Sequence, residues 1–87
     1  MNNPNTRIIA QNGKHGLEVY LDMNGSIRYL TKRRRSGLIY LLLKNGMTIG
    51  ELSRIKPGSS RRKQKTYHYA RYLLKLVEDC FKYDLAA

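Results

Sequence analysis

Two runs of basic residues are the most chemically distinctive feature of this chain. Residues 32–35 are four consecutive cations, and residues 61–65 contain four more. Lysine and arginine side chains bind the phosphates of polyanions, and arginine can also form paired hydrogen bonds with a guanine edge. The chemistry that these residues predict is therefore binding rather than bond making or breaking.

The net charge points in the same direction. The chain of 87 residues has 17 Lys and Arg against six Asp and Glu, a formal net charge of +11. Thirteen of the basic residues fall within residues 32–75, where Glu51 is the one acid. An ordinary solvated surface mixes charges of both signs. The excess predicts a nucleic acid as the first partner and an anionic membrane surface as the second.

Residue patterns for catalysis or metal binding are weak. The two histidines and Cys80 share no spacing typical of metal ligands, so we predict neither a metal site nor a cofactor. Glu78 and Asp79 are adjacent and would point in different directions on a helix, so they predict no acid–base pair. His68 and Arg71 match the His-x-x-Arg of tyrosine recombinases, but the chain is too short for that catalytic domain. We expect a binding protein and not an enzyme.

The cysteine content and the hydropathy indicate an intracellular protein. Cys80 is the one cysteine of the sequence, so no disulfide can form within the chain. The first residues are polar and include Pro4, which predicts no secretory leader. The longest apolar run, Leu38 to Leu43, is too short to cross a bilayer. We therefore expect a cytoplasmic location, nucleoid-associated in a prokaryote, and no membrane partner.

The N-terminal third has the pattern of β-strands. Residues 1–5 predict a flexible start, and residues 7–11, 17–22 and 26–30 have strand character. Within the second run, Leu17, Val19 and Leu21 alternate onto one face. Asn12-Gly13 and Asn24-Gly25 are turn signals, because these residue types accept positive φ. The pattern predicts an antiparallel hairpin or meander whose apolar face needs a helix to cover it.

The apolar block at residues 38–43 predicts a central helix. We expect this helix to run from Lys32 to Lys44, with Thr31 as its cap and Asn45-Gly46 at its end. A helix that is apolar on more than one face should be touched by several elements. Leu42 is then expected to be buried.

Two further helices are predicted after this one. Thr48 and Glu51 have the spacing of a capping box, and the helix that they begin should stop by Lys56, because Pro57 follows. A longer helix has an apolar stripe that includes Tyr67. This helix begins either after a Ser60 cap or, if residues 59–64 form a loop, near residue 65.

Two stretches of the helical part resemble a known family. Residues 41–53 (LLLKNGMTIGELS) and 72–79 (YLLKLVED) look like the matching parts of bacterial and archaeal winged-helix regulators. Residues 32–82 are thereby similar to the winged-helix / helix-turn-helix DNA-binding superfamily. The resemblance implies an α+β, winged-helix-like fold, in which an N-terminal antiparallel β-hairpin or meander precedes a three-helix helix-turn-helix unit. It also implies one DNA-binding domain over residues 6–87.

The resemblance further implies where DNA would bind. The third helix would be the recognition helix in the major groove of double-stranded DNA. The candidate DNA-binding residues are Arg33, Arg34, Arg35, Ser59, Ser60, Arg61, Arg62, Lys63, Lys65, Thr66, His68 and Arg71. Lys14 and His15, at the tip of the N-terminal hairpin, would act as a wing in the minor groove. We expect a transcriptional regulator of prokaryotic or viral origin that binds as a homodimer.

RNA is the main alternative partner. Seven tyrosines interleaved with cations could stack on single-stranded bases. Most of these tyrosines have spacings that suit packing, however, and the strands show no exposed row of aromatic residues. An RNA-binding or ribosome-associated protein is therefore the second hypothesis. A protein-interaction module that docks through Glu78 to Asp84 would leave the basic segment unexplained and ranks last.

Overall fold

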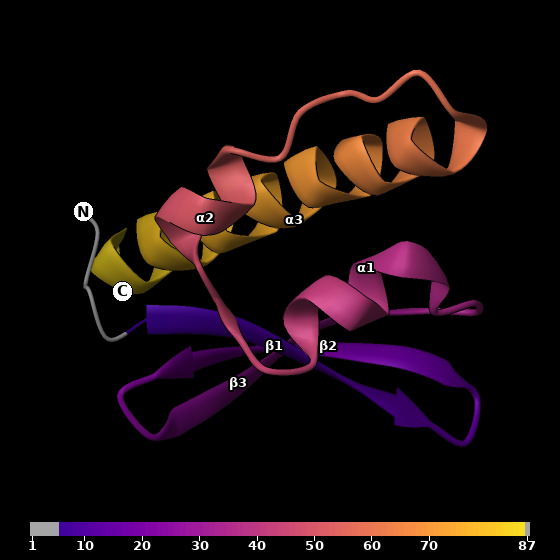
Figure 1. The fold of residues 1–87 in the computed structure, drawn as a ribbon. Coiled ribbons are helices and arrows are strands. Elements are labelled where there is room, and N and C mark those ends of the chain that lie inside the picture. The colour runs from indigo at the N-terminus through magenta and orange to yellow at the C-terminus, as the bar shows by residue number, and fades with distance from the viewer. Residues whose placement is uncertain (1–5, 87) are drawn as a thin grey trace.

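The chain folds into two layers, a four-stranded antiparallel sheet with helices on one of its faces (Figure 1). The computed structural model describes the backbone of residues 6–86 and the side chains of residues 6–82. The predicted flexible start, residues 1–5, lies outside the described residues.

Three strands form the predicted antiparallel meander. These are β1 (Thr6–Gly13), β2 (Gly16–Met23) and β3 (Ser26–Arg33). The β2–β3 connection is the expected tight turn, with φ of 55° at Asn24 and 96° at Gly25. The Asp22 carboxylate accepts a hydrogen bond from the Gly25 N–H at 2.8 Å. The local sequence signals therefore predicted this part of the fold correctly.

A short fourth strand completes the sheet. Strand β4 (Met47–Thr48) pairs with β1, which gives the order β3-β2-β1-β4. The sequence did not indicate this strand, because two residues are too few to show alternation.

The core lies between the inner face of the sheet and the helices. Leu17, Val19 and Leu21 are fully buried, which confirms that helices cover this face. Every helix contributes to the buried cluster, which consists of Ile8, Ala10, Leu17, Val19, Leu21, Ile39, Leu43, Leu52, Ala70, Leu73 and Val77. No helix covers the opposite face of the sheet in Figure 1.

The first helix begins later than predicted. Helix α1 spans Gly37–Leu43, because Lys32 and Arg33 belong to β3, where they pair with Glu18 and Leu17. The prediction of a helix from Lys32, capped by Thr31, was therefore wrong. The sheet gives these backbone groups partners, whereas four cations in a first helical turn would oppose the helix dipole.

Helix α1 is also less buried than predicted. Ile39 and Leu43 are fully buried, but Leu41 is 57% exposed and Leu42 is 41% exposed. The helix packs on the sheet and α3 with one side only, so the prediction that Leu42 is buried was wrong.

The second helix begins at the predicted capping box. Helix α2 spans Ile49–Ser53 and ends before the predicted limit at Lys56. Thr48 Oγ1 accepts a hydrogen bond from the Glu51 N–H at 3.0 Å, and Glu51 Oε1 accepts one from the Thr48 N–H at 2.9 Å. These hydrogen bonds with Thr48 lower the pKa of the Glu51 carboxyl.

The third helix is the longest element. Helix α3 spans Arg61–Ala86, and Ser60 Oγ accepts a hydrogen bond from the Lys63 N–H at 3.2 Å. The Ser60 start is therefore confirmed, and residues 61–64 are helical. Its buried stripe contains Thr66, Ala70, Leu73 and Val77. Tyr67 lies one residue off this stripe and is half-buried, so its predicted place in the core was wrong.

These elements do not form the predicted winged-helix-like fold. The structure has a four-stranded sheet followed by helices of seven and five residues and one long helix of 26 residues. A three-helix helix-turn-helix unit is not present among the described residues. Strand β3 takes the start of the expected first helix, and Pro57 lies in the connection that separates α2 from α3.

The capping box gives a first testable prediction. Thr48→Ala removes the side-chain acceptor of the Glu51 N–H and should lower the free energy of unfolding by about 1 kcal/mol. Chemical denaturation measures the change, with the exposed Ser59→Ala as the control. Equal midpoints for the two variants would contradict a stabilising role of the cap.

Candidate nucleic-acid interface

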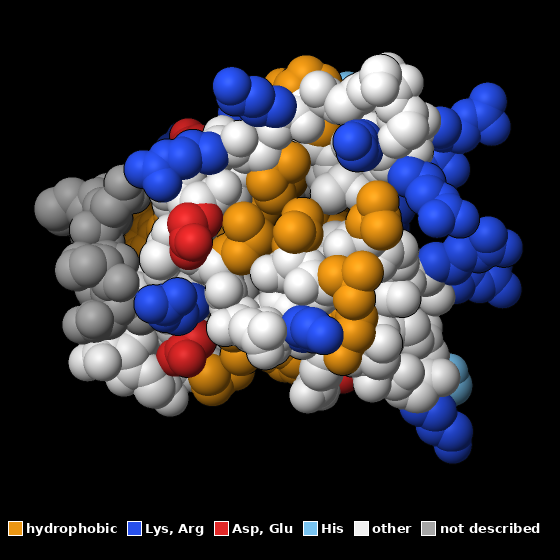
Figure 2. Space-filling model, viewed as in Figure 1, with side chains coloured by type: hydrophobic (Ala, Val, Ile, Leu, Met, Phe, Trp, Pro, Cys, Tyr) orange, Lys and Arg blue, Asp and Glu red, His pale blue; other side chains and the backbone are white. Residues whose placement is uncertain are grey.

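Three basic segments that are distant in sequence meet at one end of the molecule. They are the β1–β2 turn with Lys14 and His15, the end of β3 with residues 33–35, and the start of α3 with residues 61–65 (Figure 1). We call this region the basic end. Its eight Lys and Arg are Lys14, Arg33, Arg34, Arg35, Arg61, Arg62, Lys63 and Lys65. Figure 2 shows a crowd of Lys and Arg side chains projecting at this end, whereas the larger acidic surfaces in that view lie toward the other end.

Close backbone packing fixes the β1–β2 turn against the end of β3. Gly16 has a φ of +124°, and a Cβ atom there would lie 2.2 Å from the Arg33 carbonyl oxygen and 2.7 Å from that of Arg34. Only glycine allows this approach. The turn that carries Lys14 and His15 is therefore held beside the arginines of β3.

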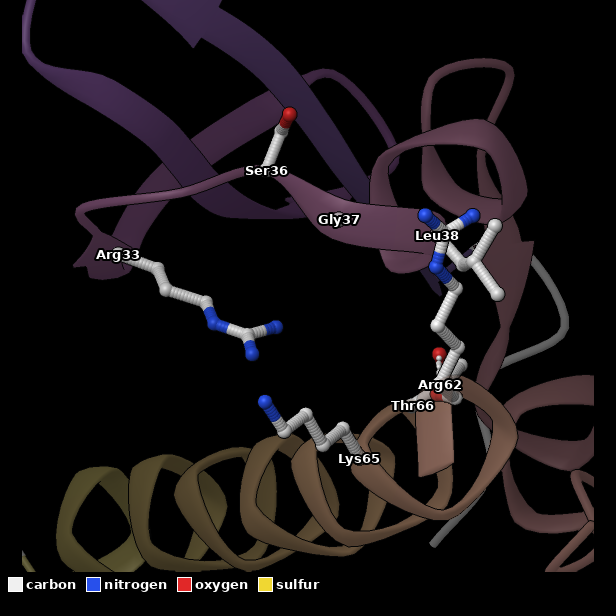
Figure 3. A pocket seen from close by; sticks show the side chains of 7 residues that line it. All are labelled: Arg33, Ser36, Gly37, Leu38, Arg62, Lys65 and Thr66. Atoms are coloured by element: carbon white, nitrogen blue, oxygen red, sulfur yellow. Dashed lines mark hydrogen bonds between the residues drawn. The ribbon is translucent and has the colours of Figure 1, made fainter. Parts of the chain in front are cut away.

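A cavity of about 380 Å³ lies between the end of β3, the start of α1 and the first turns of α3. Its cationic lining residues are Arg33, Arg62 and Lys65, and its other lining residues are Ser36, Gly37, Leu38 and Thr66. Figure 3 shows the Arg33 and Lys65 side chains reaching toward one another across the opening, with Arg62 extending toward Leu38. The Ser36 side chain points away from this space. Among the described residues, no acidic side chain lines the cavity.

Tyr69 holds the Arg33 side chain in place. The Arg33 guanidinium lies over the Tyr69 ring at 4.5 Å from its centroid, which is a favourable cation–π distance. Burial raises the pKa of the Tyr69 hydroxyl, and the nearby Arg33 charge acts in the opposite direction. The tyrosine is therefore neutral at physiological pH and supports the guanidinium through its ring.

The other predicted contact residues divide into two groups. Arg34 and Arg35 are exposed and line a shallow hollow together with Arg33. Ser59 and Ser60 are also exposed, just before α3. These residues belong to the basic end.

Three predicted residues lie elsewhere or are covered. Thr66 is 8% exposed, and its hydroxyl donates a hydrogen bond to the Arg62 carbonyl at 2.9 Å. His68 is exposed farther along α3, with its ring 5.4 Å from that of Tyr67. Arg71 lines a different hollow that also contains Glu78 and Asp79. Thr66 therefore lines the cavity as a covered residue, whereas the structure does not bring His68 or Arg71 to it.

Few patterns in the sequence pointed to the residues that shape the cavity. Gly37 and Leu38 were predicted only as parts of a helix. Tyr69 follows Arg62 and Lys65 at the helical spacing that places side chains on one side of a helix. That spacing was the available signal, but the partner segment in β3 was not predictable from it.

The uncovered face of the sheet carries a pair of aromatic residues. Tyr20 and Tyr29 lie on neighbouring strands with ring centroids 5.9 Å apart, edge to face. Tyr29 is 54% exposed and Ile27 is 55% exposed. The described strands thus place one pair of aromatic residues on this face, with Tyr29 as its exposed member.

Comparisons with protein-family models, with curated proteins and with solved structures found no match for this chain. Within the described residues, no group of three or more His, Cys, Asp or Glu side chains is placed to hold a metal ion. None of the helices in residues 6–86 combines the length and the apolar character that crossing a membrane requires.

Proposed function

We propose that the basic end binds nucleic acid, with double-stranded DNA as the partner. The observation that carries this proposal is the convergence of three separate basic segments on one surface (Figure 2). Like charges repel, and bringing them together opposes folding unless a polyanion compensates for it. A duplex supplies closely spaced phosphates over a broad surface, and cations on several elements can contact these phosphates together.

The distribution of acidic residues favours an orientation in which the basic end faces the DNA. Glu51 lies in α2, and Glu78 and Asp79 lie in the C-terminal half of α3. Glu18 lies beside Gly13 of the β1–β2 turn, but the eight cations of the basic end outnumber it, so positive charge is concentrated at that end. A polarised protein is steered so that its positive end meets the phosphates first. We propose control of transcription by occupation of a DNA site as the role, since a binding surface is sufficient for it.

RNA or single-stranded nucleic acid is a second candidate, because Tyr20 and Tyr29 are placed on an open sheet face. Stacking on such a face is a common way to bind unpaired bases. The same face carries Arg7 and Lys32 but also Glu18 and Asp22, as the strand register shows. These four charges balance one another, so the face lacks the positive charge that would hold a backbone. The basic end therefore favours the duplex.

A binding titration tests the two candidates. We expect the protein to bind double-stranded DNA more tightly than single-stranded DNA or structured RNA of matched length. The logarithm of the affinity for the duplex should fall steeply with the logarithm of the salt concentration, because phosphate contacts release counterions. Fluorescence anisotropy at two salt concentrations measures both quantities. Tighter binding of RNA or single strands, sensitive to Tyr29→Ala, would contradict the duplex proposal and support the second candidate.

A further inference from the structure

We propose that the cavity between β3, α1 and α3 is a binding site for a single phosphate group. Arg33 and Lys65 would hold the phosphate from opposite walls, and Arg62 would approach from a third side (Figure 3). The inference rests on the proposed function in one respect, namely that the bound phosphate is part of a nucleic acid. The cavity itself is argued from its own charges and geometry.

The charges of the cavity are unbalanced. Arg33, Arg62 and Lys65 line it without a carboxylate among the lining residues. Within the described residues, none of these three side chains forms an ion pair with an acidic side chain. Facing cations repel each other, and the repulsion is stronger in a recess than on an open surface, where water screens it. A bound anion would turn this repulsion into attraction from both walls.

One of the three cations is also held in position. Arg33 is placed by the Tyr69 ring beneath its guanidinium, at 4.5 Å. Arg62, Lys65 and Tyr69 succeed one another at intervals of three and four residues, so they share one side of α3. Thr66 packs below them, with its hydroxyl bonded to the helix backbone. Because Arg33 is already placed, it loses less side-chain entropy when it binds an anion than a free side chain does.

Gly37 brings the backbone of α1 close to Arg33 in the wall of the cavity. Its φ is +62°, and a Cβ atom there would lie 3.8 Å from an Arg33 guanidinium nitrogen. The backbone of α1 therefore comes close to the guanidinium without a side chain in between. An arginine fork that is open in this way can donate two parallel hydrogen bonds to a phosphate, which lysine cannot do.

The size of the cavity allows two sources of the phosphate. A volume of about 380 Å³ is within the range of small-ligand sites and exceeds what a bare ion needs. It accepts a phosphate together with part of an attached sugar. The group is therefore either an internal phosphate of a strand or the terminal phosphate at its end, and the chemistry of recognition is the same for both.

A phosphate titration followed by NMR tests the site directly. Inorganic phosphate should cause saturable shifts of the backbone amides around Gly37 and Lys65, at constant ionic strength set by chloride. In Lys65→Gln and in Arg33→Gln the affinity for phosphate should fall at least about fivefold. Lys75→Gln removes an equal charge from an exposed residue that lies outside the basic end and does not line the cavity, and it should leave the affinity unchanged. Lys65 is exposed and its side chain forms no hydrogen bond or ion pair within the part of the chain that the structure describes, so Lys65→Gln should fold even if Arg33→Gln is unstable.

Two DNA duplexes of the same sequence, one with and one without 5′-phosphates, distinguish an internal phosphate from a terminal one. If the site holds an internal phosphate, Lys65→Gln weakens the binding of both duplexes equally. If it holds a terminal phosphate, the native protein prefers the phosphorylated duplex and Lys65→Gln removes the preference. Saturable phosphate binding without any duplex binding would uphold the site and overturn the proposed function. Phosphate shifts that are absent, or equal in the native protein and Lys65→Gln, would overturn the site even if the duplex binds.

Discussion

Replacing Arg61, Arg62 and Lys63 together with glutamine is expected to lower the affinity for duplex DNA by about a hundredfold or more at moderate salt. The three side chains are exposed on the first turn of α3, within the basic end. If each contacts a phosphate, the slope of log affinity against log salt should also decrease by roughly three. Anisotropy titrations over a salt series measure both effects.

The same substitutions should leave the fold intact. No acidic residue lies in the first turn of α3, so the three cations there interact unfavourably with the positive end of the helix dipole. Glutamine removes this cost and keeps a good helix-forming residue at each position. The unfolding midpoint is therefore expected to stay the same or to rise, and a loss of binding cannot be attributed to unfolding.

A second triple variant provides the matched control. Lys44, Lys75 and Lys82 are exposed residues outside the basic end, and their replacement by glutamine lowers the net charge of +11 by the same three units. The control should keep most of the affinity. An equal loss in both variants would show that binding follows the net charge of the protein rather than this end. Retained binding by the first variant would remove residues 61–63 from the interface.

Local signals in the sequence predicted the elements that local interactions determine. The Asn24-Gly25 turn, the capping box of Thr48 and Glu51, and the Ser60 cap each depend on hydrogen bonds within four residues. The structure confirmed all three. The alternation of apolar and polar residues likewise predicted the buried face of Leu17, Val19 and Leu21.

The errors arose where tertiary pairing overrode the local pattern. Residues 31–35 have no strong preference of their own, and pairing of Lys32 and Arg33 with β2 decides that they are strand. The run 38–43 is apolar throughout, so periodicity could not show which of its leucines face the solvent. The winged-helix-like fold was inferred from two short stretches of sequence, and such stretches fit several arrangements of helices. They also do not determine the length of α3.

The candidate site was only partly predictable for a related reason. Clusters of cations can be recognised directly in a sequence, and the runs at residues 33–35 and 61–65 were both identified in this way. Their convergence around one cavity depends on β3 ending beside the first turns of α3, which is a long-range contact. The support of Arg33 by Tyr69 depends on the same contact. Sequence patterns therefore gave the chemistry of the site but not its geometry.

Leu43→Ala is expected to lower the free energy of unfolding by about 2–5 kcal/mol. Leu43 is fully buried at the end of α1, in the cluster where the sheet meets the helices, and removing its side chain leaves a cavity there. A domain of this size has a small margin of stability, so the loss would be a large part of the total. Chemical denaturation gives the free energy. If the variant is too unstable to measure, Ile39→Val is a milder truncation of the same helix face, with an expected loss of about 1 kcal/mol.

The neighbouring Leu42→Ala is the informative comparison. Leu42 is 41% exposed, and alanine is the better helix former, so its loss of packing is largely offset and the expected change is below about 1 kcal/mol. A helix buried on all sides, as the apolar run suggested, would instead give similar large losses for both leucines. Equal destabilisation would therefore contradict the one-sided packing of α1. That packing holds Gly37 and Leu38 beside the start of α3, so the same result would also contradict the geometry of the phosphate cavity.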